Sequence, residues 1–107
     1  MIPPTIDKDN IDKFRTGVYP NVEHITWKVP YLDDDVLENF PNVNNFDCSD
    51  NHLSSLIGLS KLPKLKTLVF DNNIIRNFED LRECINLEVI MCSGNFRTFI
   101  HYHSHIN

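Results

Sequence analysis

Apolar residues recur along this chain at a fixed spacing of about 22 residues. In the segment 43–53 they occupy positions 43, 46, 48 and 53, and an asparagine stands at position 51. The pattern returns one and two spacings later. The three copies are Val43, Phe46, Cys48 and Leu53 with Asn51; Leu65, Leu68, Phe70 and Ile75 with Asn73; and Leu87, Ile90 and Cys92 with Asn95. Such a repeat predicts a solenoid, in which each turn packs only against its neighbours.

The second half of each copy carries three further apolar positions. They are Leu56, Leu59 and Leu62; Phe78, Leu81 and Cys84; and Ile100, His103 and Ile106, where His103 stands in for a leucine. A weaker unit precedes these copies. It has Val22, Ile25 and Trp27 at the strand positions, Leu32 at the next, and Pro30 where the other copies have asparagine.

Apolar and polar residues alternate at the start of each copy. Phe46 and Cys48 alternate with Asn45 and Asp47, which is the period of a short strand with one buried face. One such strand per turn predicts an α/β fold, a right-handed solenoid with a parallel sheet on its concave face and short helical or 3-10 returns on its convex face. We expect an N-terminal cap over 1–21 and repeats over 22–42, 43–64, 65–86 and 87–107.

This spacing resembles the leucine-rich repeat, in the class with about 22 residues per turn. The resemblance covers residues from about 22 to 106. The local sequence around Asn51 and Asn95 is also similar to Asn-rich repeats of giant viruses of amoebae and of some bacteria. The family resemblance implies a protein-binding surface on the concave strand face.

The asparagine of each copy stands where the chain leaves its strand. We expect Asn51, Asn73 and Asn95 to turn inward and form a ladder, because an amide offers both donors and an acceptor to backbone groups that no strand partner can reach. This role is structural.

A solenoid exposes apolar residues at its ends unless it is capped. We expect a helix that begins at Asp7, runs to about Thr16 and ends at Gly17, with Ile11 and Phe14 on one face. At the other end the last turn becomes less apolar and has no dedicated cap, so we expect a monomer or weak self-association through that turn.

Composition narrows the range of partners. The chain has 107 residues, enough for one domain, and a formal net charge of −5. Phosphate backbones and anionic lipid repel such a chain, so we expect neither nucleic acid nor membrane as a partner. There is no apolar run long enough to span a bilayer and no signal-like start, and the three cysteines lack a paired spacing. We therefore expect an intracellular location, in the cytoplasm or in the host cytoplasm if the source is viral.

Two segments contain possible metal ligands. Asp33, Asp34 and Asp35 lack the spacing of a calcium loop, and a helix start with Asp35 and Glu38 as a capping box is the preferred interpretation. Alternate histidines on a strand point the same way and can share Zn²⁺ or Ni²⁺. In the repeat register, however, the histidines of this chain belong to the final turn, which we expect to be loosely packed. We therefore expect no metal and no cofactor. The histidines are His101, His103 and His105.

Catalytic chemistry has little support in the sequence. Cys48, Cys84 and Cys92 occupy apolar positions of the repeat, where thiols are inert more often than nucleophilic. Ser49, Asp50 and His52 have the residue types of a hydrolase triad, but residues so close along one strand do not converge. We expect no enzyme activity and no catalytic residue.

The outward positions of the strands are the candidate binding residues. Most outward residues have an ordinary interpretation as solvated strand residues, but apolar ones on adjacent turns indicate a contact site. The candidates are Asp47, Thr67, Val69, Asp71, Val89 and Met91. We interpret the chain as a non-enzymatic scaffold for an unidentified protein. The alternative is a structural or truncated repeat remnant that self-associates.

Overall fold

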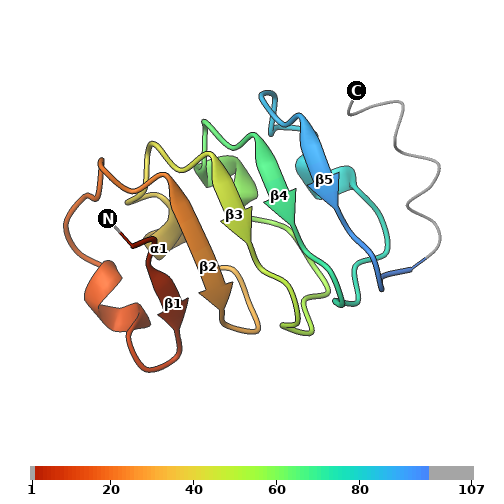
Figure 1. The fold of residues 1–107 in the computed structure, drawn as a ribbon, viewed down its shortest axis with the longest axis horizontal. Coiled ribbons are helices and arrows are strands. Elements are labelled where there is room, and N and C mark those ends of the chain that lie inside the picture. Colours follow the sequence, from red (N-terminus) through yellow and green to blue (C-terminus); the bar gives the residue numbers. More distant parts are fainter. Residues whose placement is uncertain (1, 97–107) are drawn as a thin grey trace.

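The computed structural model describes residues 2–96, and its strands form one sheet of five strands in chain order (Figure 1). The strands are β1 (Thr5–Asp7), β2 (His24–Lys28), β3 (Asn45–Asp47), β4 (Thr67–Val69) and β5 (Val89–Met91). All neighbouring pairs are parallel. Paired residues are 22 apart between β3 and β4, as in Phe46 and Leu68, and also between β4 and β5. The predicted repeat solenoid with a parallel sheet is confirmed.

Short helical segments return the chain between strands and lie behind the sheet in the view of Figure 1. They are α1 (Asp34–Leu37), η2 (Leu59–Lys61) and η3 (Glu79–Leu81), of which the last two are 3-10 helices. Each return buries one or two apolar residues toward the sheet, such as Leu59 and Leu81. The predicted helical or 3-10 returns are therefore present.

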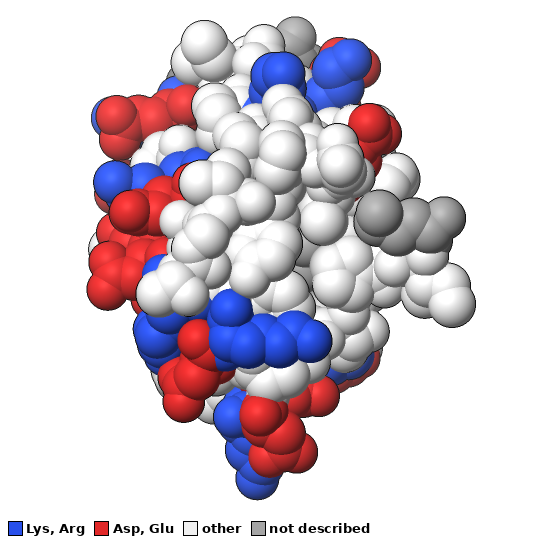
Figure 2. Space-filling model, turned by 90° about the vertical axis from the view of Figure 1, so that its left-hand side faces the viewer, with Lys and Arg blue, Asp and Glu red and all other residues white. Residues whose placement is uncertain are grey.

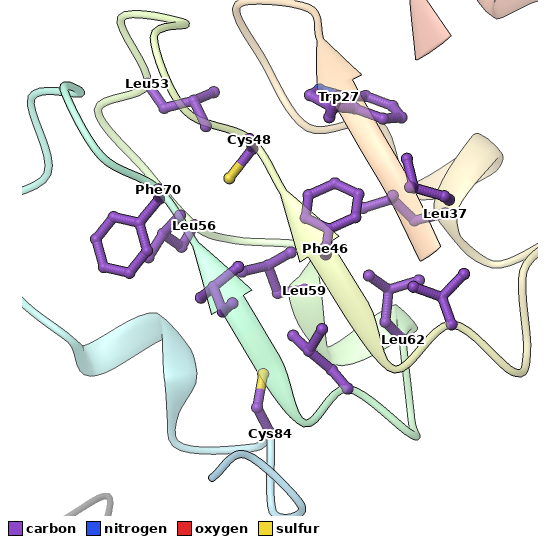
Figure 3. Close-up of a cluster of buried hydrophobic side chains, with 14 of the residues drawn as sticks. Trp27, Leu37, Phe46, Cys48, Leu53, Leu56, Leu59, Leu62, Phe70 and Cys84 are labelled. Atoms are coloured by element: carbon purple, nitrogen blue, oxygen red, sulfur yellow. The ribbon is translucent and has the colours of Figure 1, made fainter. Parts of the chain in front are cut away.

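The core lies between the sheet and these returns, and Figure 3 shows part of it. Phe46, Leu68 and Phe70 point inward from neighbouring turns and are fully buried, while Asp47 and Val69 beside them are only half-buried. The Trp27 and Phe46 rings are in contact, with centroids 5.7 Å apart. Successive turns stack at the spacing of neighbouring strands. Equivalent side chains of successive turns therefore lie next to one another in the core, and each covers the one before it.

The N-terminal segment differs from the predicted helix. Residues Thr5–Asp7 form a strand paired with β2, and only Ile11–Phe14 form a 3-10 helix, η1. Asp7 accepts hydrogen bonds from the backbone N–H groups of Asp9 and Asn10 and so caps a turn, not a long helix. The expectation of a helix from Asp7 to Thr16 was wrong because Ile6 continues the buried column of Trp27, and its burial outweighs local helix propensity.

The acidic run at 33–35 begins a helix, as expected, but with a different cap. Asp33 is the N-cap of α1, and its carboxylate accepts a hydrogen bond of 3.1 Å from the backbone N–H of Asp35. The same carboxylate pairs with Arg15 of the N-terminal segment at 2.7 Å. The expected Asp35–Glu38 capping box was wrong, because the helix begins two residues earlier, with Asp33 as its cap.

Several expectations concern residues outside the described range. They are the apolar positions Ile100, His103 and Ile106, the possible metal ligands His101, His103 and His105, and the interface proposed for the final turn. No helix within residues 2–96 has the length and hydropathy that would let it cross a bilayer.

Candidate protein-binding surface

Asn73 bridges two turns of the solenoid from a buried position. Its Oδ1 accepts hydrogen bonds from the backbone N–H groups of Asn51, at 3.0 Å, and Leu53, at 2.9 Å. Its Nδ2 donates to the carbonyls of Cys48 and Phe70, both at 3.0 Å. One side chain thus satisfies backbone groups where two successive strands end and the chain bends away from the sheet.

Asn51 and Asn95 make related bonds in the turns on either side. Asn51 Nδ2 donates to the carbonyls of Trp27, at 2.7 Å, and Cys48, at 2.9 Å. Asn95 Nδ2 donates to Phe70 and Cys92, and its Oδ1 accepts from the N–H of Ile75. The first unit has Pro30 at this position and offers neither an amide nor a backbone N–H there. The three asparagines are thus placed as a ladder along the turns.

A second column of asparagines, at the opposite ends of the strands, was not anticipated from the sequence. Asn42 Nδ2 donates to the carbonyl of Pro20 at 2.7 Å, and Asn86 Nδ2 donates to the carbonyl of Pro63 at 3.0 Å. Lys64 replaces asparagine in the turn between them and donates to Asn42 Oδ1. The available signal was the recurrence of a proline followed by a polar residue before β2, β3 and β4, with Ile85 in place of the proline before β5.

The residue before each ladder asparagine adopts a left-handed backbone conformation. Asp50 has a φ of 62°, Asn72 of 57° and Gly94 of 76°. These residue types tolerate that region better than others do, because asparagine and aspartate can bond locally and glycine has no Cβ. At each of these exposed positions the chain therefore turns so that the following ladder asparagine points into the core. The positions are 50, 72 and 94.

The sheet face that points away from the returns carries the predicted binding residues. We call it the concave face and define it by Asp47, Thr67, Val69, Asp71, Val89 and Met91. The registers place Thr67 beside Val89 and Val69 beside Met91. Val89 is 47% exposed and Met91 is 52% exposed, so two large apolar side chains of one strand face solvent. The structure thus brings the four residues Thr67, Val69, Val89 and Met91 together on two adjacent strands, and we call these four the β4–β5 patch.

Two carboxylates lie next to the β4–β5 patch. Asp47 pairs in register with Val69, and Asp71 follows β4. One oxygen of Asp47 accepts from the N–H of Ser49, at 3.0 Å, and one oxygen of Asp71 accepts from the N–H of Ser93, at 2.8 Å. These bonds fix both side chains in orientation. They leave carboxylate oxygens that are not used in either bond, beside an apolar surface.

The three cysteines are free thiols with differing burial. Burial raises the pKa of the Cys48 thiol above its ordinary value, and the adjacent Asp47 carboxylate adds to the shift. Burial, followed by Glu83, raises the pKa of Cys84 to about 11. Burial, followed by Asp71, also raises the pKa of Cys92. Each shift disfavours the thiolate, which is the nucleophilic form.

The other candidate chemistry is not assembled in the part of the chain that the structure describes. No group of three or more histidine, cysteine or acidic side chains within residues 2–96 is placed to hold a metal ion. No hydrogen bond joins any two of Ser49, Asp50 and His52 there. The Ser49 hydroxyl instead accepts from the backbone N–H of Asp71 at 3.1 Å.

The comparison with protein families bears on the central turns. Residues 41–83 match a family model described as leucine rich repeats, in two copies. These residues include β3, η2, β4 and η3, together with Asn51 and Asn73. No curated protein matches the chain. The similarity to Asn-rich repeats of giant viruses stays a prediction, because the family match does not bear on it.

Proposed function

We propose, from the premise that this chain is built from leucine-rich repeats, that it is a non-enzymatic scaffold that binds a protein partner through the concave face of its sheet. Leucine-rich repeats commonly mediate protein–protein interaction, and stacked repeats offer an extended surface for it. The fold does not identify the partner, so the proposal rests on the surface itself.

The observation that carries the proposal is the exposed apolar pair Val89 and Met91, which lies beside Thr67 and Val69. Exposed apolar residues on adjacent strands form a continuous area, and such areas mark contact sites more often than scattered ones do. Burial of Val89 and Met91 against a partner releases the water that they now order. Their rigid position on a strand lowers the entropic cost of binding.

Charge next to the β4–β5 patch favours one kind of partner surface. Asp47 and Asp71 supply carboxylate oxygens at its border, and the chain as a whole has a net charge of −5. A partner with an apolar residue for the patch and lysine, arginine or backbone N–H groups around it matches this arrangement of an apolar centre and a polar rim. Nucleic acid and anionic lipid match it poorly.

The state of the thiols supports the non-enzymatic part of the proposal. Burial raises the pKa of Cys48 and of Cys84 and so disfavours the nucleophilic thiolate. The free thiols support the intracellular, cytoplasmic location that the proposal includes.

The test compares two double variants in quantitative cross-linking capture from the source cells. Val69→Glu with Met91→Lys alters the concave face, and Glu79→Lys with Glu83→Lys alters exposed residues on the convex side. We expect the concave variant to lose a protein that the wild type captures, because two charged side chains replace the apolar contact surface and a partner would have to remove them from water. The convex variant should keep it.

The opposite outcome, with binding kept by the concave variant and lost by the convex one, would place the interface elsewhere. Capture of nothing except further copies of this chain would favour the alternative of a self-associating repeat remnant. Near-UV circular dichroism of both variants checks that each is folded, so that a loss of capture reports on the surface.

A further inference from the structure

A cavity of about 480 Å³ lies between the first two repeats, where the chain passes from the sheet to the returns. Its walls come from the segment that leads from β2 into α1 and from the segment between β3 and η2. Cavities of this volume commonly hold small organic molecules. The residues that matter for its chemistry are Tyr31, Leu32 and Asp34 on the first segment, and Leu53, Ser54 and Ile57 on the second.

The cavity coincides with two interruptions of the repeat, and the first is Gly58. One spacing later the equivalent residue is Asp80, which joins two turns. Its Oδ2 accepts hydrogen bonds from the backbone N–H of Leu56, at 3.0 Å, and from the hydroxyl of Ser55, at 3.3 Å. Gly58 has no side chain with which to make such a bridge. The first two repeats are therefore not joined at this position.

The second interruption is Pro30 in the asparagine ladder. Oδ1 of Asn73 accepts from two backbone N–H groups of the preceding turn. For Asn51 the equivalent residues are Pro30, which has no N–H, and Leu32, whose N–H bonds to no other described residue. Asn51 bonds only through its Nδ2 and its backbone N–H. Among the described residues its Oδ1 atom therefore has no hydrogen-bond donor, although Asn51 is only 7% exposed.

The unused acceptor of Asn51 is open to a small molecule. Each buried side-chain nitrogen or oxygen of the described residues has a hydrogen-bond partner. Because Oδ1 of Asn51 has none, it is not sealed inside the core. By its ladder position it faces Pro30 and Leu32, which belong to one wall of the cavity. A donor that reaches such a poorly hydrated acceptor satisfies a group that the chain leaves unpaired.

The charge on the cavity wall is negative, and Asp34 supplies the part that is not paired. Asp33 also contributes to the wall, but its carboxylate is paired with Arg15 at 2.7 Å. None of the ion pairs between described residues includes Asp34. A Cβ at Gly58 would lie 2.5 Å from Asp34 Oδ1, so the glycine allows this carboxylate to lie against the second repeat. The cavity wall contains no lysine, arginine or histidine.

Other charged side chains near this end of the molecule are mixed in sign. Figure 2 views the molecule from the β1 end, and acidic, lysine and arginine side chains gather along one side and toward the bottom. Mixed charge of this kind lets a carboxylate find a cation within the chain, as Asp33 does with Arg15. Asp34 is left to pair with a cation from outside.

Apolar side chains complete the cavity. Tyr31 and Ile57 are exposed and lie on the two different segments, and Leu53 between them in sequence is buried. Trp27 Nε1 donates to the carbonyl of Tyr31 at 2.9 Å, which fixes the backbone that carries the tyrosine ring. Aromatic rings attract organic cations over their faces. The wall therefore combines apolar surface with groups that favour positive charge.

We propose that this cavity binds a small organic cation with an apolar body, of the arylalkylammonium class. The ammonium group lies by the Asp34 carboxylate and donates toward Oδ1 of Asn51, and the apolar body packs against Tyr31 and Ile57. An anion is disfavoured because the wall has no cation to pair with it. The proposal does not depend on a protein partner for the concave face.

The test titrates the full chain with three probes that share a phenyl ring and a short chain but differ in charge. They are phenylethylammonium, phenylethanol and phenylacetate. In amide NMR spectra, phenylethylammonium should cause saturable shifts at Leu32, Ser54 and Ile57. Its affinity should exceed that of phenylethanol about fivefold, and phenylacetate should cause no saturable shift there. Equal affinity for the three probes, or no saturable shift with phenylethylammonium, would overturn the proposal.

Asp34→Asn and Asp35→Asn form a matched pair that tests the charge. Both residues are exposed and adjacent in α1, but Asp35 does not contribute to the cavity wall. Asp34→Asn should lower the affinity for phenylethylammonium about fivefold, and Asp35→Asn should leave it unchanged. An equal loss in both variants would show a general effect of net charge and would contradict a specific site.

A second pair tests the location without changing any charge. Ser54 contributes to the cavity wall and Ser60 does not, and both are exposed. Ser54→Trp should fill the cavity and abolish the saturable shifts, whereas Ser60→Trp should keep them. The amide spectrum of each free variant shows that it is folded. Binding that survives in Ser54→Trp would place the ligand elsewhere and overturn the proposal.

Discussion

The Oδ1 atom of Asn73 lies 3.0 Å from the backbone nitrogen of Asn51, one turn earlier in the solenoid. This bond joins two members of the same ladder across consecutive repeats. It connects side-chain chemistry in one turn to backbone conformation in another, so the ladder position of each repeat affects the stability of its neighbour.

We predict that Asn73→Ala is strongly destabilising. It removes the acceptor for the N–H groups of Asn51 and Leu53 and the donor for the carbonyls of Cys48 and Phe70. Each buried group left unpaired costs about 1 to 3 kcal/mol. Urea unfolding followed by Trp27 fluorescence should therefore show a midpoint far below that of the wild type, at an unchanged slope.

The control for this variant is Asn21→Ala, which should unfold with the wild-type midpoint because the side chain is exposed. Asn72 is the nearer exposed asparagine, but its left-handed backbone makes alanine costly there. Equal midpoints for Asn73→Ala and Asn21→Ala would contradict the structural role of the ladder.

The repeat and its core were predictable because one packing constraint acts several times. Phe46 and Leu68 are paired in adjacent strands, and both positions must be apolar since each covers the next. An apolar residue that recurs at a fixed spacing can be recognised in a single sequence, whereas an apolar residue at one position cannot be told from chance. The same argument identifies the ladder asparagines, which recur together with these residues.

The N-terminal strand was missed because it has only one copy of the pattern and a competing local signal. Asp7 followed by Ile11 and Phe14 is typical of a helix start, and this signal favoured the wrong element. The spacing did carry the correct one, since Ile6 precedes Trp27 by the same interval that separates Trp27 from Cys48. The side chain of Asn10 bonds to β1, with Nδ2 donating to the Thr5 carbonyl and Oδ1 accepting from the Asp7 N–H. These bonds occur in one copy of the pattern and therefore could not be recognised by periodicity.

The left-handed column makes a second prediction. Gly94→Ala should destabilise the protein, because a Cβ there would need Asn72 to move and because alanine is unfavourable at a φ of 76°. The backbone cost alone is about 1 to 2 kcal/mol. Asn72→Ala should cost a similar amount, whereas Ser93→Ala, at the adjacent exposed position, should cost less. Thermal melts of the three variants give the order, and an Asn72→Ala variant as stable as the wild type would contradict the left-handed assignment.

A third prediction concerns thiol reactivity at neutral pH. Cys48 is fully buried and Cys92 is partly exposed, and the pKa of each thiol is raised. Both the low thiolate fraction and the burial slow attack on a disulfide reagent. Titration of the native protein with such a reagent should modify Cys92 first and Cys48 only on unfolding. Rapid modification of Cys48 without denaturant would show that it does not lie in the buried column.

A fourth prediction follows from the direction of the Cys84 shift. The folded thiol keeps its proton to a pKa of about 11, whereas the unfolded thiol loses it near 9.0. Between these two values the unfolded state therefore binds fewer protons than the folded state. The contribution of Cys84 to the free energy of unfolding is at its maximum below about pH 9 and decreases as the pH rises toward about 11. Cys84→Ala should lessen the slope of stability against pH in that window. An unchanged slope would indicate that Cys84 does not ionise on unfolding there.

The last prediction tests which strand residues face the core. Leu68 and Val69 are neighbours in β4, but Leu68 is fully buried and Val69 is half-buried on the concave face. The same substitution at both positions should have opposite consequences. Val69→Glu should keep the fold at a cost on the order of 1 kcal/mol, because the new carboxylate can reach water from the half-buried outward position. Leu68→Glu places an unpaired carboxylate in the core, and its side chain does not match the space that Leu68 fills. The protein should therefore not fold. A shift of one residue in the strand register would exchange the two faces. If Val69→Glu unfolded the chain while Leu68→Glu did not, the concave face would be the buried one, and the β4–β5 patch would not be available to a partner.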